Sequence, residues 1–126
     1  MEICAQRNVI GVRGEDVVLP CLFKHGKQKT LKDLHLLFAK DEGMKKIIQQ
    51  NLVYNSSSKY TSSDFKGRIE PVGNPSSGDG SLQIRNLRME DERTYVCRFQ
   101  WTNAEGREKG FETRHTKRPK LHVDGE

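Results

Sequence analysis

The chain has 126 residues, which predicts a single domain over residues 1–126 and leaves no room for two separate hydrophobic cores. Apolar residues make up 33% of it, the mean hydropathy is -0.80, and no run approaches the roughly 20 apolar residues that a membrane-spanning helix needs. The net charge of +5 would suit an anionic partner, but the 22 basic and 17 acidic residues are interspersed, which is typical of an ordinary solvated surface.

Short segments rich in β-branched, aromatic and other apolar residues alternate with turn residues along the whole chain. Clusters of glycine, aspartate and asparagine separate these segments. Many short strands at such spacing predict an all-β fold, either a sandwich or a barrel. In chain order, we expect strands over residues 9–12, 17–23, 34–39, 46–54, 67–72, 81–87, 94–101 and 111–123.

Several of these segments show the period of two that is expected when one face of a strand is buried. Leu82 and Ile84 alternate with Gln83 and Arg85, which we expect to face outward and to make the outer face of their sheet polar, and the same alternation runs through 94–101. Trp101 has the parity of the inward set, which favours core packing over a role as an aromatic anchor for a partner. On 94–101 we expect Tyr95, Cys97, Phe99 and Trp101 to face inward and Val96, Arg98 and Gln100 to face outward.

The cysteines bear on the compartment of the protein. Cys4, Cys21 and Cys97 form no C-x-x-C pair, so a zinc site is not expected. One disulfide with one cysteine left over is the natural count. A disulfide points to an oxidising compartment.

The segment at 87–97 carries Asp91, Tyr95 and Cys97 in an arrangement that resembles the D-x-G-x-Y-x-C signature of variable-type immunoglobulin domains. Upstream, GEDVVLPC ends in Cys21 at a distance that suits the inter-sheet disulfide of that family. The resemblance implies an all-β immunoglobulin-like β-sandwich, V-type, in which two antiparallel sheets are joined by a Cys21–Cys97 disulfide.

The same resemblance assigns structural roles to three further features. Tyr95 would be the tyrosine corner, with its hydroxyl bonded to backbone a few residues upstream. Arg68, in DFKGRI, would pair with Asp91 across the bottom of the sandwich. The family's core tryptophan is missing, and we expect Leu36 to take its place.

The chain departs from the antigen-receptor pattern at two more points. Arg93 stands where the signature has glycine, and 111–123 lacks the G-x-G bulge of joining segments. These departures indicate a divergent receptor domain. Individual stretches resemble butyrophilin-type costimulatory molecules, the coxsackie and adenovirus receptor group and myelin protein zero. The resemblance implies immune recognition or cell adhesion on the extracellular side of a membrane-anchored protein.

No catalytic motif is present, and the four histidines lack metal-ligand spacing, so we expect neither an enzyme nor a cofactor or metal site. The resemblance implies that a partner docks on the sheet of strands G, F, C and C′. We expect that partner to be a protein on another cell or a second copy of this chain, and we do not expect nucleic acid. The candidate residues of this face are His35, Leu37, Arg98, Gln100 and Asn103.

Two alternative ligands remain open at this point. Arg98 directly follows the cysteine of strand F, where sialic-acid-binding relatives place the arginine that grips the sugar carboxylate. Residues 107–122 form a basic stripe that would attract heparan sulfate or lipid head groups, although charge on an edge strand also prevents aggregation. Separately, Asn55 begins an N-glycosylation sequon, Asn55-Ser56-Ser57, near the C′ edge.

Overall fold

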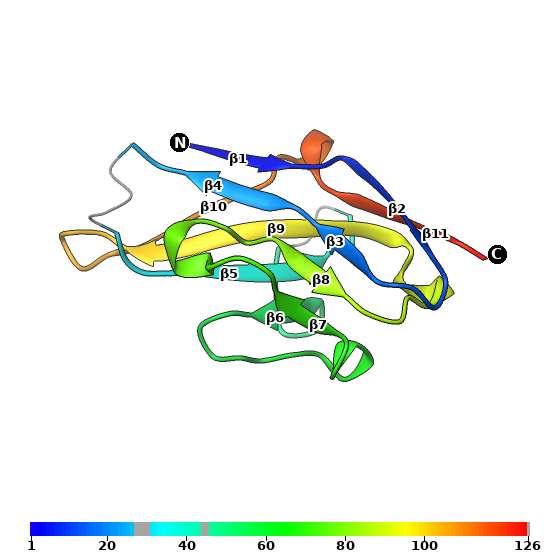
Figure 1. The fold of residues 1–126 in the computed structure, drawn as a ribbon. Coiled ribbons are helices and arrows are strands. Elements are labelled where there is room, and N and C mark those ends of the chain that lie inside the picture. Colours follow the sequence, from blue (N-terminus) through cyan, green and yellow to red (C-terminus); the bar gives the residue numbers. More distant parts are fainter. Residues whose placement is uncertain (27–30, 44–45, 126) are drawn as a thin grey trace.

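The computed structural model describes residues 1–26, 31–43 and 46–125 (Figure 1). Within these ranges, no helix has the length and apolar character needed to cross a membrane. The strands are β1 (Glu2–Ala5), β2 (Asn8–Val12), β3 (Val17–Leu19), β4 (Cys21–Lys24), β5 (Lys32–Lys40), β6 (Leu52–Asn55), β7 (Ile69–Pro71), β8 (Leu82–Ile84), β9 (Arg93–Thr102), β10 (Glu108–Glu112) and β11 (Lys120–Asp124).

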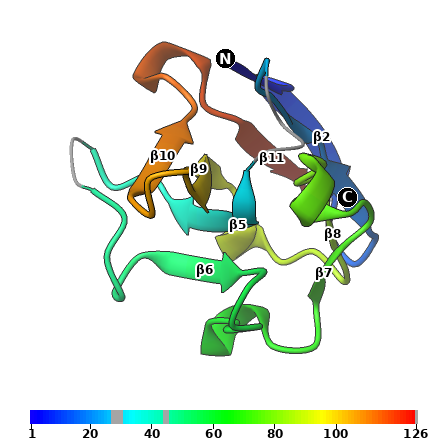
Figure 2. The same cartoon turned by 90° about the vertical axis from the view of Figure 1, so that its left-hand side faces the viewer.

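The strands pack in two layers, which Figure 2 shows nearly end-on. In the front sheet β6, β5 and β9 lie side by side, and both β10 and β11 pair with β9. The short strand β2 extends this sheet by pairing in parallel with β11. The back layer contains the pair β1 and β4 and the three strands β3, β8 and β7. The predicted all-β, two-layer immunoglobulin sandwich is therefore confirmed.

A single disulfide joins the two layers at the centre of the core. Cys21 on β4 is bonded to Cys97 on β9, with the two Cα atoms 6.7 Å apart. The inward side chains around this bond are fully buried, because alternation on each strand directs them between the sheets. Leu36, Ile84, Tyr95 and Phe99 are each 0% exposed. Trp101 also packs in this cluster, against Phe23.

Alternation fails at one position of β9. Val96 was expected to face outward with Arg98 and Gln100, but it is buried, as is Ala39, its cross-strand neighbour on β5. The outer face of the front sheet is therefore covered at this end and open only at the other. This restricts the candidate binding face to the half that contains Arg98 and Gln100.

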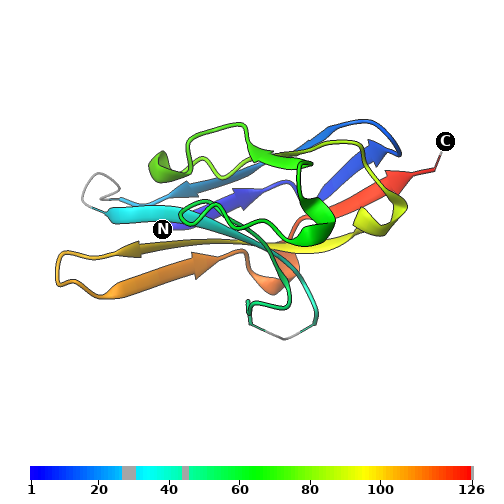
Figure 3. The same ribbon diagram turned by 90° about the horizontal axis from the view of Figure 1, so that it is seen from below.

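The structure also corrects several predicted strands, and the predicted strand 17–23 is two strands, β3, which pairs with β8, and β4, which pairs with β1. A strand β1 precedes the first predicted one, and of the segment 46–54 only Leu52 onward is strand. The predicted strand 111–123 is two strands, β10 and β11. A 3-10 turn at His115–Lys117 lies between them, and Figure 3 shows the break at the orange-red part of the chain.

A buried ion pair closes one end of the sandwich. The Arg68 guanidinium donates two hydrogen bonds to Asp91, from Nη1 to Oδ2 at 2.8 Å and from Nη2 to Oδ1 at 3.0 Å. The Tyr95 hydroxyl donates to the Asp91 carbonyl at 2.6 Å. Hydrogen bonding to Asp91 raises the pKa of Arg68, and burial raises the pKa of Tyr95. The expected ion pair and tyrosine corner are thus both present.

We expect Cys4 to be chemically accessible while Cys21 and Cys97 are not. Cys4 is exposed and is not part of a disulfide, whereas Cys21 and Cys97 form a disulfide with each other in the core. Iodoacetamide should therefore label one cysteine without reduction, and non-reducing peptide mapping should find the Cys21 and Cys97 peptides linked. A peptide that links Cys4 to either of them would contradict the strand assignment.

Replacing Asp91 should destabilise the domain far more than removing an exposed partner of the same kind. Asp91→Ala leaves the buried Arg68 charge uncompensated, which typically costs about 3–5 kcal/mol. Glu70 pairs with Arg85 on the exposed back sheet, so Glu70→Ala should cost at most about 1 kcal/mol. Urea denaturation of both variants measures the difference. Equal midpoints would show that the Asp91 pair does not stabilise the fold.

Candidate functional site

The outer face of the front sheet brings residues from four strands into one row. Leu37 on β5 lies opposite Asn55 on β6 and, on its other side, opposite Arg98 on β9. Arg98 in turn lies opposite Glu112 on β10. Because directly opposite residues on one face of a sheet have neighbouring side chains, these four side chains form a continuous line across the sheet.

A second row runs beside the first. His35 on β5 lies opposite Gln100 on β9, and Gln100 lies opposite Gly110 on β10. Four of the five predicted face residues, His35, Leu37, Arg98 and Gln100, are therefore adjacent, and each is half-buried. The result is a patch with Leu37 among hydrogen-bonding side chains.

Gly110 determines how Arg98 lies on this patch. A β-carbon at Gly110 would overlap the guanidinium of Arg98, so the arginine lies over the bare backbone of β10. From there Nη1 of Arg98 donates to Oε1 of Glu112 at 2.8 Å. The guanidinium is thus held close to the backbone of β10.

Glu112 links Arg98 to a second arginine, which the sequence did not assign to this face. Its other oxygen, Oε2, accepts a hydrogen bond from Nη2 of Arg118 at 2.8 Å. Arg118 Nη1 lies 3.2 Å from Oδ1 of Asp41, close enough for an ion pair but outside hydrogen-bond geometry. The side chains of Arg118 and Asp41 are only 10% and 9% exposed. We call these residues the arginine network: Arg98, Glu112, Arg118 and Asp41.

The arginine network changes the interpretation of the basic stripe at 107–122. Arg118 is neutralised within the network, so it does not contribute to an anion-binding surface. Within the described part of the chain, the other basic residues of the stripe are exposed and have no ion pair: Arg107, Lys109, Arg114, Lys117 and Lys120.

Asn103 is used by the turn between β9 and β10. Its side-chain oxygen accepts hydrogen bonds from the backbone N–H groups of Glu105, at 3.0 Å, and Arg107, at 2.9 Å. Gly106 takes a φ of 79°, which favours glycine. The side-chain carbonyl of Asn103 therefore stabilises the turn. This residue lies at the end of the patch.

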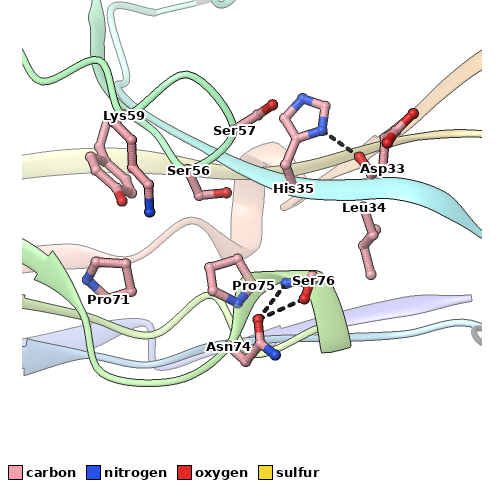
Figure 4. Close-up of a pocket in the computed structure, with 11 residues that line it drawn as sticks. Asp33, Leu34, His35, Ser56, Ser57, Lys59, Pro71, Asn74, Pro75 and Ser76 are labelled. Atoms are coloured by element: carbon pink, nitrogen blue, oxygen red, sulfur yellow. Dashed lines mark hydrogen bonds between the residues drawn. The ribbon is translucent and has the colours of Figure 1, made fainter.

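The sequon lies at the β6 margin of the face. Asn55 ends β6, and its side-chain oxygen accepts the N–H of Ser57 at 2.9 Å. Nearby, a cavity of about 270 Å³ opens between β5 and the 3-10 turn at Pro75–Ser77. Figure 4 shows the His35 ring at its rim, where Nδ1 donates to the Asp33 carbonyl at 2.7 Å.

The outer face of the back layer is less polar than its predicted outward residues Gln83 and Arg85 suggest. Val18 on β3 and Leu22 on β4 are 42% and 43% exposed. The contrast between a mixed front face and a purely polar back face is therefore wrong. What distinguishes the front face is the arginine network and the contiguous rows of side chains, and not apolar content alone.

Two layers joined by one disulfide between β4 and β9, together with the tyrosine corner, define an immunoglobulin-type sandwich domain. The family model for the immunoglobulin V-set domain matches residues 5–116. The chain therefore belongs to the immunoglobulin V-set family, a non-enzymatic kind of domain found in cell-surface adhesion and receptor-like proteins.

Comparison with known proteins gives relatives of this kind. The CXADR-like membrane protein of Rattus norvegicus is 34% identical over 102 residues, which cover 74% of this chain and 27% of that protein. The sialic acid-binding Ig-like lectin 15 of Homo sapiens is 30% identical over 112 residues, covering 87% and 33%. The chain thus spans about a quarter to a third of these relatives.

A solved structure of Tim-1 superposes with a TM-score of 0.64, covering 94% of this chain and 92% of that one. The two sequences are 23% identical, so this likeness supports the fold alone.

The arginine network should stabilise the domain mainly through Arg118. Arg118→Met leaves the buried Asp41 carboxylate unpaired, which should cost about 2 kcal/mol or more. Arg98→Met removes a more exposed pair and leaves Glu112 bound to Arg118, so it should cost at most about 1 kcal/mol. Thermal and urea unfolding of the two variants give the comparison. If Arg98→Met is the more destabilising variant, Arg118 is not the residue through which the arginine network mainly stabilises the domain.

Proposed function

We propose that this domain binds a protein partner through the outer face of β10, β9, β5 and β6, on the extracellular side of a membrane-anchored protein. The observation that carries the proposal is the contiguous patch of His35, Leu37, Arg98 and Gln100. An apolar residue surrounded by hydrogen-bonding side chains is typical of protein interfaces. The partner is a protein on another cell or a second copy of this chain.

The held conformation of Arg98 supports this proposal energetically. A free arginine loses side-chain entropy when it is immobilised at an interface, at roughly 0.5–1.5 kcal/mol for a side chain of this kind. Here the ion pair with Glu112 and the bare backbone at Gly110 already restrict it. Part of that cost is therefore met during folding, which makes Arg98 suited to a central contact.

Sialic acid binding is the alternative, favoured by the position of Arg98 and by the similarity to a sialic acid-binding lectin. A sugar carboxylate would need the guanidinium as a bidentate partner. Glu112 already accepts from Nη1 of Arg98, so a sialic acid would have to displace it or bind the remaining nitrogens. This competition is the reason we prefer a protein partner.

A glycan on Asn55 would limit the face on one side. Asn55 lies directly opposite Leu37 at the margin formed by β6. We propose that an attached glycan covers this margin and leaves the β9 and β10 side to the partner. The docking area would then centre on Arg98 and Gln100.

Charge reversal at Arg98 should weaken binding, and the same change at Arg85 should not. Both arginines lie on outer faces, and each pairs with a glutamate. Arg98→Glu should reduce the binding of a tetramerised domain to partner-bearing cells at least about fivefold, which corresponds to about 1 kcal/mol. Arg85→Glu is the matched control on the back layer. Loss of binding with Arg85→Glu alone would place the partner on the other sheet.

A conservative substitution of Arg98 distinguishes a sialic acid ligand from a protein partner. Arg98→Lys keeps the charge but removes the bidentate fork. If the partner is a protein, this variant should retain most binding, and sialidase treatment of the cells should have little effect. Binding that both treatments abolish would identify sialic acid as the ligand.

A further inference from the structure

The strand β10 has one free edge, and a local insertion separates it from β11. Glu112 lies opposite Arg98, and Lys120 lies opposite Thr94. Thr94 and Arg98 are four residues apart on β9, whereas Glu112 and Lys120 are eight residues apart. The segment between β10 and β11 therefore contains four extra residues, which loop out of the sheet. Because the segment before β2 is β1, which pairs with β4 in the back layer, β2 pairs with β11 only, and among the described strands β10 pairs with β9 alone. Figure 2 shows β10, in orange, at the margin of the sheet.

The register identifies which backbone groups are unpaired at this edge. The Thr113 N–H donates to the Cys97 carbonyl at 2.9 Å, and the Asn103 N–H donates to the Arg107 carbonyl at 2.9 Å. Hydrogen-bonded and non-hydrogen-bonded positions alternate in an antiparallel pair. The residues that direct their N–H and C=O groups away from β9 are therefore Glu108, Gly110 and Glu112.

A groove of about 400 Å³ runs beside this edge, between β10 and β1. Ile3 and Phe111 provide its half-buried apolar lining. Arg7, Arg114 and Lys117 line it as well, together with the carboxylates of Glu2 and Glu112, of which Glu112 is paired with Arg98 and Arg118. Within the described part of the chain, none of the three cations has an ion pair or a side-chain hydrogen bond. Two of them lie on the looped-out segment.

Two properties of the edge indicate what fits it. Its unpaired N–H and C=O groups match the backbone of an extended chain, which can add to a sheet as a new strand. The unpaired cations match acidic side chains, and the apolar lining matches small apolar ones.

A second copy of this chain fits the edge less well. Antiparallel pairing of two β10 strands centred on Gly110 would place Glu108 of one copy opposite Glu112 of the other. Pairing centred on Lys109 would place the two copies of Lys109 opposite each other. Like charges directly opposite one another are unfavourable. Only pairing centred on Phe111 avoids them, and it overlaps just three residues of each strand. Each copy also has a net charge of +5.

We propose that the free edge of β10 binds an extended peptide segment of a partner protein by strand addition, with apolar and acidic side chains on the side of the peptide that faces the groove. The charged residues of β10 oppose indiscriminate pairing, and the unpaired Arg114 and Lys117, which follow β10, attract the acidic side chains of the partner. This site goes beyond the proposed function and is independent of it, because it uses the backbone edge of β10 and the groove beside β1.

The test begins with a displayed library of random twelve-residue peptides selected on the purified domain. Enriched peptides should be acidic, and synthetic copies should bind in fluorescence anisotropy. N-methylation of every second peptide amide should weaken binding at least tenfold in one frame and little in the other, because only one frame faces β10. No enrichment, or equal effects of the two frames, would overturn strand addition.

Protein variants locate the site. Arg114→Glu with Lys117→Glu should weaken peptide binding at least tenfold, whereas Lys46→Glu with Lys66→Glu, an equal charge change at exposed sites elsewhere, should not. Glu108→Pro removes one N–H of the free edge without removing a bond to β9 and should also weaken binding tenfold at an unchanged melting temperature.

Three results would overturn the proposal. Binding that needs the cations but tolerates both Glu108→Pro and amide methylation would indicate a polyanion site. A concentration-dependent dimer that Glu108→Pro abolishes would assign the edge to a second copy. Equal loss in the two charge-reversal pairs would show attraction to overall charge only.

Discussion

The register of β5 against β9 is the constraint on which the other features depend. A strand has a side-chain period of two, so a slip of one residue would exchange its buried and exposed faces. Here the disulfide fixes Cys97 toward the back layer, and the Tyr95 hydroxyl fixes the start of β9 to the carbonyl of Asp91. The same register that buries Leu36 opposite Phe99 places Leu37 opposite Arg98 on the outer face.

The position of Arg68 supports this register from outside the sheet. Its guanidinium donates to three backbone carbonyls, those of Asp64, Arg85 and Asn86, besides the Asp91 carboxylate. A buried charge with several partners tolerates little displacement, because each lost hydrogen bond leaves a desolvated group. The interaction therefore specifies the arrangement of the segments before β7 and β9, even where its net contribution to stability is modest.

Much of this could be predicted from the sequence because it depends on local patterns. Alternation identified the buried side chains of β9 and four adjacent residues of the outer face, and the signature around Cys97 indicated the disulfide and the tyrosine corner. Alternation failed at Val96, since a strand pattern does not reveal what covers the outer side of a sheet. Exposed Val18 and Leu22 were likewise overlooked, because only the polar positions of the back layer were considered.

The arginine network was beyond prediction for a different reason. Asp41, Glu112 and Arg118 meet through a chain path that depends on the break between β10 and β11, and the composition of 107–122 showed only a basic stripe. The segment contains no proline or glycine inside the 3-10 turn to mark the break, since His115–Lys117 reads as ordinary strand or loop. A four-residue insertion in one strand becomes visible only when its partner strand is known.

That insertion affects both surfaces proposed for this domain. It places Arg118 where its Nε donates to the Thr113 carbonyl and its Nη2 to Glu112. It also places Arg114 and Lys117 in the groove beside the edge of β10, which β2 does not reach because the segment before it pairs with β4 in the back layer. Glu112 belongs to both: its carboxylate holds the two arginines, and its backbone N–H and C=O belong to the free edge. A change in the length of the 113–119 segment would therefore alter the two surfaces together, whereas substitutions within either one act locally.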